Sequence, residues 1–309
     1  MTETLSIVIP VYKSSKSLSK LVEKLEDVCS TLPYNYEVIF INDSPYHTAT
    51  NDALNRLVKE HKNVVHIRLT KNFGQQPATL CGLNHAKGDY ILTMDDDLQH
   101  HPEDIEKLLA LKTHDVVIAK FPKKKHNIFK NIGSKIKGLF DHWILGKPKH
   151  IKLSSYRLMS RSIAEKILSI KTPYPFIPAL LFSVTDDIVN VEVSHHSRDE
   201  GRSSYTFFKL LKLFSNLIIN NSSILLRVIG YLGFSSAFIS VVFAIVILIK
   251  RFTQEYVLQG WTSLILSVLF FGGLTLFALG VIGEYLIRIV GTAESRPVYF
   301  VRQISRGED

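Results

Sequence analysis

The fold is decided at residues 90–99, where an apolar strand, Tyr90-Ile91-Leu92-Thr93-Met94, leads directly into Asp95-Asp96-Asp97-Leu98-Gln99. Adjacent carboxylates repel one another, so three in succession are typical of a cation site. Oxygen ligands without histidine or cysteine suit Mg²⁺ or Mn²⁺, and Mg²⁺ is commonly held by one or two carboxylates and the phosphates of a substrate. The alternative is a solvated acidic turn before a helix near Pro102. Because open α/β sheets bind ligands at the carboxyl ends of their strands, the sequence favours a metal site for a nucleotide diphosphate.

The N-terminal part of the chain alternates between strand and helix patterns. Strands are predicted at 5–10, 36–41, 64–69 and 89–94, and helices at 17–30, 50–60 and 76–86. Near-continuous apolar strands indicate an α/β fold with a mostly parallel sheet covered by helices.

Three strand ends of this sheet are expected to converge on one crevice. Pro10 and Tyr12, Asp43, and the acidic cluster each follow a predicted strand. Tyr12 is suited to stacking on a base, and Asp43 to accepting hydrogen bonds from a base or ribose. A buried tyrosine and a turn-forming aspartate are the ordinary alternatives for each residue taken alone.

Two long uncharged segments predict a transmembrane hairpin. Residues 228–249 and 262–282 carry no charged side chain, and the first of them spans about 33 Å as a helix at ~1.5 Å per residue. Basic residues on both flanks, such as Arg227 and Arg288, predict that both ends face the cytoplasm. Because the N-terminal strand pattern begins directly, the N-terminal domain is expected in the cytoplasm. We therefore expect the chain to be a multi-pass protein of the plasma (inner) membrane.

A basic segment precedes the hairpin. Residues 120–152 contain ten lysines and one acid, Asp141, whereas the whole chain has a net charge of +9. Apolar residues recur within it at helical spacing, which predicts a basic amphipathic helix on anionic membrane lipid. A helix packed on the sheet with a solvated lysine face is the alternative. Nucleic acid is not expected as a partner, because the hairpin places this segment near a membrane.

Several motifs resemble the GT-A glycosyltransferases of family 2, most closely the polyprenyl-phosphate glycosyltransferases, which include dolichyl-phosphate mannose synthases and bactoprenol glucosyltransferases. The resemblance covers nearly the whole chain. The motifs are Ile9-Pro10-Val11-Tyr12, Ile41-Asn42-Asp43-Ser44, Lys71-Asn72-Phe73-Gly74-Gln75, Gly88-Asp89-Tyr90, residues 95–99 with Pro102-Glu103, residues 155–161 and residues 198–205.

This resemblance implies a membrane enzyme that moves one sugar from a nucleotide sugar, expected to be UDP-linked, onto a polyprenyl (undecaprenyl) phosphate with inversion, for modification of cell-envelope glycans. Its motifs imply roles for individual residues. Asp95, Asp97 and Gln99 would hold the metal. Arg157 and Arg198 would bind phosphates, and these two arginines would be catalytic together with Asp95 and Asp97. The donor-binding residues would be Pro10, Tyr12, Asp43, Asn72, Gly74 and Asp96.

The sequence departs from the family pattern at three places. Lys13 stands where asparagine is frequent, Asp96 where a small residue is usual, and residues 44–47 replace the usual Gly-Ser turn. The base and the sugar of the donor are therefore open.

The acceptor chemistry agrees with the implied activity. A phosphate monoester has its second pKa near ~6 and is mostly a dianion at neutral pH, so it needs little activation by a base. The leaving nucleoside diphosphate needs a cation, and guanidinium groups suit phosphate oxygens because they bind them in a bidentate fork.

Two other functions compete with this one. A processive polysaccharide synthase would normally carry a Gln-x-x-Arg-Trp motif, which the chain lacks. A non-catalytic membrane assembly partner would not need an intact acidic cluster.

The predicted domain organisation has four parts. Residues 1–120 are the nucleotide-sugar-binding core and 121–222 the acceptor side with amphipathic juxtamembrane helices. Residues 223–290 are the two-helix hairpin and 291–309 a cytoplasmic tail. A homo-oligomer is expected, because Gly272 and Gly273 allow membrane helices to approach closely.

Overall fold

The computed structural model describes residues 2–121, 148, 150–193, 260–294 and 296–307, with scattered positions between 229 and 249. They form two compact units, Met1–Ser204 with Ser295–Asp309, and Tyr205–Glu294. Arg198, the lysines of residues 122–147 and most of the predicted first membrane helix lie outside the described residues.

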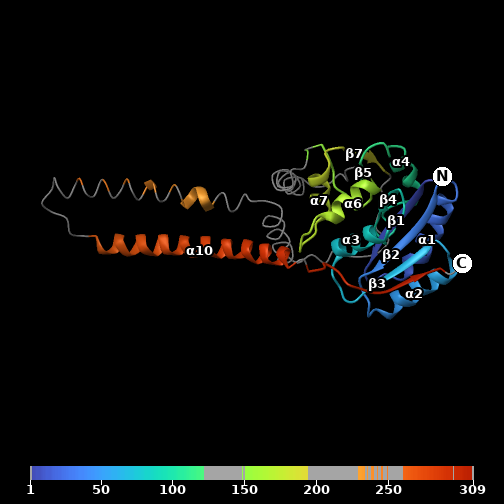
Figure 1. Ribbon diagram of the computed structural model, residues 1–309, viewed down its shortest axis with the longest axis horizontal. Helices are drawn as coiled ribbons and strands as arrows, with labels where there is room; N and C mark the ends of the chain where they lie inside the picture. Colours follow the sequence, from blue (N-terminus) through green and yellow to red (C-terminus); the bar gives the residue numbers. More distant parts are fainter. Residues whose placement is uncertain are drawn as a thin grey trace, which may run out of the picture. The chain divides into compact units, whose positions relative to one another are not determined.

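The first unit is built on an eight-stranded sheet in the order β7-β5-β6-β4-β1-β2-β3-β8 (Figure 1). The central strands β1 (Thr4–Val11), β2 (Asn35–Asn42), β3 (Val64–Leu69) and β4 (Tyr90–Thr93) are parallel. The antiparallel partners are β6 (Arg157–Ser160) beside β4 and β8 (Val301–Arg306) beside β3. The remaining strands, β5 (Val116–Lys120) and β7 (Ile188–Glu192), pair in parallel.

Helices cover both faces of the sheet, as predicted. One face carries α1 (Lys16–Cys29), α2 (Thr48–Glu60) and α4 (Ile105–Leu109), which follows the 3-10 turn Pro102–Asp104. The other face carries α3 (Gln75–His85), α6 (Arg161–Ser169) and α7 (Ile177–Val184). The sequence therefore predicted every strand and helix of residues 5–94 correctly, and the mostly parallel α/β fold is confirmed.

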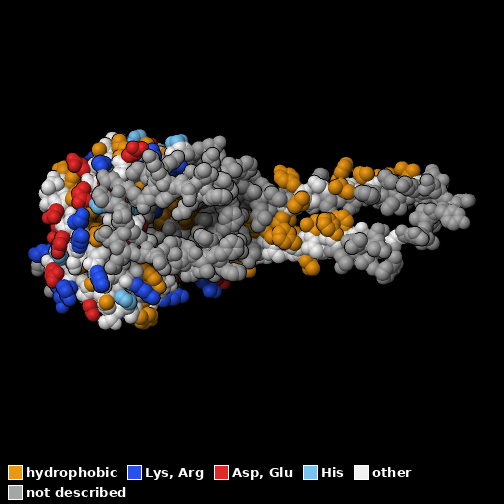
Figure 2. Space-filling view, turned by 180° about the vertical axis from the view of Figure 1, so that it is seen from behind, with side chains coloured by type: hydrophobic (Ala, Val, Ile, Leu, Met, Phe, Trp, Pro, Cys, Tyr) orange, Lys and Arg blue, Asp and Glu red, His pale blue; other side chains and the backbone are white. Residues whose placement is uncertain are grey.

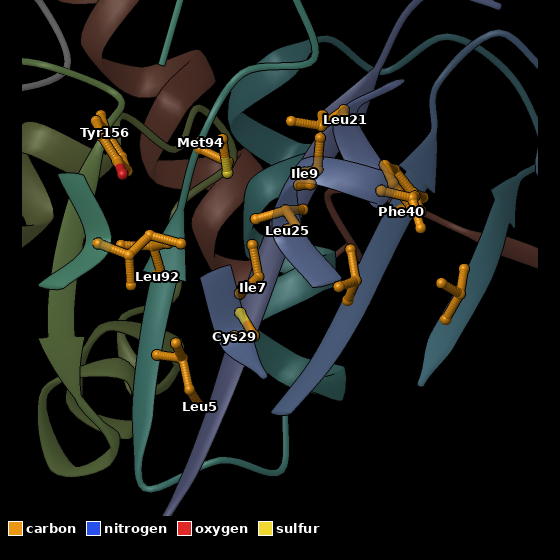
Figure 3. Packing of buried hydrophobic residues seen from close by; sticks show 14 of the residues in the cluster. Leu5, Ile7, Ile9, Leu21, Leu25, Cys29, Phe40, Leu92, Met94 and Tyr156 are labelled. Atoms are coloured by element: carbon orange, nitrogen blue, oxygen red, sulfur yellow. The ribbon is translucent and has the colours of Figure 1, made fainter. Parts of the chain in front are cut away.

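The alternation of side chains along β1 divides the core in two. Leu5, Ile7 and Ile9 pack against Leu21 and Leu25 of α1 (Figure 3). Val8 points to the opposite face and packs on α3. There Gly82 allows the helix to lie close, because an added Cβ would be 2.2 Å from Val8 Cγ1. β1 thus has both faces buried, which explains its continuous apolar sequence.

The tail differs from the sequence-based division. Residues 291–309 were predicted as a separate cytoplasmic segment, yet Val301–Arg306 form β8 on the edge of the sheet. The polar sequence of β8 explains the difference, because Arg302, Gln303 and Ser305 sit on an exposed edge strand and carry little apolar pattern.

The second unit contains one long described helix, α10 (Trp261–Ala293). Its stretch Phe270–Gly291, of 22 residues with a mean hydropathy of 1.8, is long and apolar enough to cross a membrane. Figure 2 shows hydrophobic side chains exposed along this unit. The predicted run 262–282 lies within α10. The run 228–249 lies mostly outside the described residues, so the two-helix hairpin is not confirmed.

His66 of β3 makes the stability of the first unit depend on pH. Its side chain is 3% exposed, and within the described part of the chain its Nε2 has no hydrogen-bond partner. Burial, with a contribution from Arg68, lowers the pKa of His66 to about 4. In the unfolded chain a histidine has a pKa near ~6.5, so the unfolded state binds the proton first as pH falls. The contribution of the neutral His66 to the free energy of unfolding is therefore fully present above about pH 6.5, and it is lost as the pH falls from about 6.5 to about 4.

We expect His66→Gln to remove much of this acid sensitivity, on the order of 3 kcal/mol or less for a shift of this size. The measurement is the Tm of the purified protein from pH 7.5 to pH 4.5. Parallel Tm curves for the two proteins across that range would contradict the prediction.

Candidate active site

Three loops meet at the carboxyl edge of the parallel strands. The register pairs Val11 with Asn42 and Val8 with Thr93, so the loops after β1, β2 and β4 leave the sheet side by side. The backbone is unusual in the loops after β1, β3 and β4. Among the described residues, those with φ in the left-handed region are Lys13 (59°), Leu98 (60°) and Gly74 (96°). Non-glycine residues in that region mark functional sites often enough to support a site here.

Asp95 is held by side chains from three segments of the chain. Its Oδ1 accepts a hydrogen bond from Gln75 Nε2 at 2.8 Å, and its Oδ2 accepts one from Ser155 Oγ at 2.7 Å. Its backbone N–H donates to His100 Nδ1 at 2.9 Å. Only 30% of the side chain is exposed. The carboxylate therefore has a fixed orientation at the end of β4.

His100 was not predicted as a site residue. Its imidazole is buried between the rings of Tyr156 and Phe121, at centroid distances of 4.9 and 5.6 Å. Because Nδ1 accepts from Asp95, the neutral ring carries its proton on Nε2, which lies 3.7 Å from Asp95 Oδ2. Burial lowers the pKa of His100. The signal in the sequence was a histidine directly after Gln99, within the acidic turn.

Asp96 and Asp97 have different surroundings. Asp97 Oδ1 accepts the backbone N–H of Gln99, which closes the turn around Leu98. Asp96 hydrogen-bonds to Ser14, but its Oδ2 is buried without a hydrogen-bond partner in the described part of the chain, and burial raises the pKa of its carboxyl to about 6. The structure thus brings Asp95, Asp97 and Gln99 into one turn, and links Asp96 to the β1–α1 loop.

The acidic turn supplies some, but not all, of the ligands that a divalent cation needs. Within the described residues, no three His, Cys, Asp or Glu side chains are arranged to hold a metal. The two carboxylates and the amide of the turn are oxygen ligands, and a substrate diphosphate completes such a shell in Mg²⁺ sites. This set of donors, together with the unpartnered Asp96 oxygen, fits a metal that binds with its substrate.

Asp43 joins the end of β2 to the loop before α3. Its Oδ1 accepts the N–H of Phe73 at 2.7 Å, and its Oδ2 accepts the N–H of Gly74 at 2.8 Å and Asn72 Nδ2 at 3.0 Å. The side chain is 3% exposed, and burial raises its pKa while the N–H groups lower it. The observed role of Asp43, Asn72 and Gly74 is to fix this loop. Their direct contact with a nucleotide stays a prediction.

Tyr12 has an exposed ring in the loop after β1, and the next residue of that loop bonds to the loop that contains Asp43. The residue is 54% exposed, the Lys13 ammonium lies 5.3 Å from its ring centroid, and the Lys13 N–H donates to Ser44 Oγ. Pro10 precedes it in β1, opposite Ile41. The geometry is compatible with a base stacked on Tyr12.

A cavity of about 520 Å³ adjoins the turn. Asp97 and Leu98 form one wall, and the start of α1 forms the other. The lining on the α1 side consists of hydroxyl and ammonium groups: Lys13, Ser14, Ser15, Lys16, Ser17 and Lys20. Lysines and a helix N-terminus attract phosphate groups.

Arg157 lies beneath the site. It is 3% exposed, its Nε donates to Thr93 Oγ1 at 3.3 Å, and one guanidinium nitrogen is buried without a partner in the described residues. Burial lowers its pKa to about 10, although the Asp95 charge raises it. The guanidinium therefore stands as a buried cation behind Asp95. Its predicted contact with phosphate is untested, and Arg198 lies outside the described residues.

The comparisons with known proteins agree on one family. The model of glycosyl transferase family 2 matches residues 6–168. Two curated undecaprenyl-phosphate 4-deoxy-4-formamido-L-arabinose transferases are similar to the chain. That of Aeromonas hydrophila subsp. hydrophila is 30% identical over 97% of this chain and 94% of its own length. That of Klebsiella pneumoniae subsp. pneumoniae is 29% identical over 97% and 93%.

Solved structures support the fold. Glucosyl-3-phosphoglycerate synthase of Mycobacterium tuberculosis in complex with UDP has a TM-score of 0.52 and 14% identity, over 71% of this chain and 78% of that chain. The same enzyme with Mn²⁺, UDP and glucosyl-3-phosphoglycerate gives 0.52 and 15%, over the same shares. At this identity the likeness extends to the fold alone.

We expect His100→Phe to disturb the acidic turn without emptying the core. The phenyl ring keeps the stacking on Tyr156, but the Asp95 N–H loses its acceptor, which costs about 1–3 kcal/mol for a buried group. His100→Gln retains an acceptor oxygen and should recover part of the loss. Tm and Mn²⁺ titration measure the two effects, and wild-type values of both in His100→Phe would refute this role.

Proposed function

The chain belongs to glycosyl transferase family 2, and we propose that it transfers one sugar from a nucleotide sugar to a polyprenyl phosphate, specifically undecaprenyl phosphate, with inversion. The observation that carries the proposal is the acidic turn, in which hydrogen bonds from the protein itself orient Asp95. The curated relatives support the acceptor, because their names specify undecaprenyl phosphate. A long apolar helix in the same chain suits a lipid substrate.

We assign the divalent cation, Mg²⁺ or Mn²⁺, to Asp95, Asp97 and Gln99. When bound, it would neutralise the charge that develops on the leaving nucleoside diphosphate. Gln75, Ser155 and His100 orient Asp95 for this task. The adjacent cavity has lysines of opposite charge to a diphosphate, which supports a donor bound across the turn and the start of α1.

We propose a uridine nucleotide as the donor, with its base on Tyr12 and its ribose near Pro10 and Asp43. The exposure of the Tyr12 ring supports this placement. Asn72 and Gly74 shape the wall through their hydrogen bonds to Asp43, and Asp96 ties the acidic turn to the loop that follows Tyr12.

The acceptor side needs cations and a membrane surface. A phosphate dianion approaching an anionic donor is repelled unless fixed positive charges offset its charge. We assign this fixed positive charge to Arg198, and Arg157 adds a second one from behind Asp95. The lysine-rich residues 120–152 would face anionic lipid. We further propose that the catalytic unit is cytoplasmic, that the chain crosses the inner membrane twice and self-associates, and that its product serves cell-envelope glycan modification.

Asp97→Asn should abolish transfer while the protein still folds, because each lost carboxylate removes a charge that the divalent ion requires. The assay incubates detergent-solubilised protein with radiolabelled nucleotide sugars and undecaprenyl phosphate and counts the extracted lipid. Asp52→Asn, an exposed change of the same kind on α2, is the control. Full activity of Asp97→Asn, or of wild type in EDTA, would refute the metal assignment.

Arg198→Lys should also be impaired in the same assay, because an ammonium cannot replace a bidentate guanidinium. A polymer as product would favour the processive synthase instead. No lipid product with any donor would favour a non-catalytic assembly partner.

A further inference from the structure

The strand that follows the apolar helix ends up beside the donor loops. Helix α10 ends at Ala293, residues 294–300 follow, and Val301 begins β8, which pairs with β3 through Ile67 and Ile304. β3 leads directly into the loop that binds Asp43. In Figure 1, β8 is at the red end of the colour scale, and the C-terminus lies at the sheet with β2 and β3.

Phe300 contacts this loop directly. Its ring lies 6.2 Å from the ring of Phe73, and its carbonyl accepts the backbone N–H of Thr70 at 2.9 Å. Phe73 is the residue whose N–H donates to Asp43 Oδ1 at 2.7 Å. One residue of the tail therefore contacts both ends of the segment 70–73.

Tyr299 and Arg302, which flank Phe300 in the sequence, contact two other segments near Asp43. Tyr299 hydrogen-bonds to Asn84 of α3, the helix that begins at Gln75. Arg302 lies over the ring of Tyr46, at 5.4 Å from the centroid, and Tyr46 in turn donates to the Thr70 carbonyl. The tail thus touches α3, the loop after β3 and the loop after β2, and Asp43 joins the last two of these segments.

We propose that Phe300, with Tyr299 and Arg302, positions the donor site by holding the 70–74 loop against Asp43. The proposal rests on the proposed function only in calling this the donor site. Asp43 is buried and both its oxygens are engaged by the loop, so the loop position decides where Asn72 and Gly74 lie. Gly74 has a φ of 96°, which glycine adopts without steric cost, but a glycine loses more backbone freedom on ordering than other residues, so contacts that order this loop must offset that loss. The tail provides such contacts from outside the loop.

Phe300→Ala tests the inference, with Gln303→Ala as the matched control. Gln303 lies in β8, three residues after Phe300, and its side chain hydrogen-bonds to Ser305 of the same strand. Hydrogen exchange of the full-length protein is followed on peptides covering 70–76. We expect faster exchange in Phe300→Ala and wild-type exchange in Gln303→Ala. If Phe300→Ala does not fold, Phe300→Leu, which keeps a smaller apolar contact, is measured in the same way. Wild-type exchange in the folded Phe300 variant would overturn the proposal.

Nucleotide binding supplies the second measurement. UDP and GDP, each with Mn²⁺, are titrated into the three proteins, and we expect about tenfold weaker binding in Phe300→Ala, the size of effect typical of losing one aromatic pair. With an active donor, KM should rise while kcat stays near wild type. Equal affinity in Phe300→Ala and Gln303→Ala would also overturn the inference. Failure of wild type to bind either nucleotide counts against the proposed function instead, and the exchange result then decides the inference.

Discussion

The parallel pairing of β1 with β2 on one side and β4 on the other is the constraint on which the whole site depends. It brings Tyr12, Asp43 and Asp95 to one edge, although they are far apart in the sequence. The register is fixed by burial on both faces, because a shift of one residue would exchange the side chains that meet α1 with those that meet α3. The tight fit of Gly82 against Val8 leaves no room for such a shift.

The polar groups at this edge are organised by the protein itself. Asp95 is bound by the side chains of Gln75 and Ser155 and by the His100 ring at its backbone, while Asp43 is bound by three N–H groups. Such preorganisation lowers the cost of ordering groups when a ligand arrives. The negative charge of Asp95 also offsets part of the solvation that the Arg157 guanidinium loses on burial.

Sequence reasoning found the four parallel strands of residues 5–94, the acidic turn and the family, because those features are local: apolar runs, adjacent carboxylates and short motifs. It did not find β5, β6 or β7. It did not find His100 as a support of Asp95, since that role depends on the ring lying between Tyr156 and Phe121. Nor did it find that Arg157 is buried, because a guanidinium in a four-residue strand has no sequence mark of depth. It treated 301–306 as tail, since the partner of this strand lies far back in the chain, at β3.

The position of β8 also dictates the order in which the molecule can be completed. Until residue 306 has been synthesised, the outer edge of β3 has no partner, and an open strand edge is a template for pairing with other chains. Its own partner emerges from the ribosome only after the apolar helix α10. The catalytic sheet of each new chain therefore stays unfinished while the apolar helix α10 is being made, and closure of the sheet is a late event of biosynthesis.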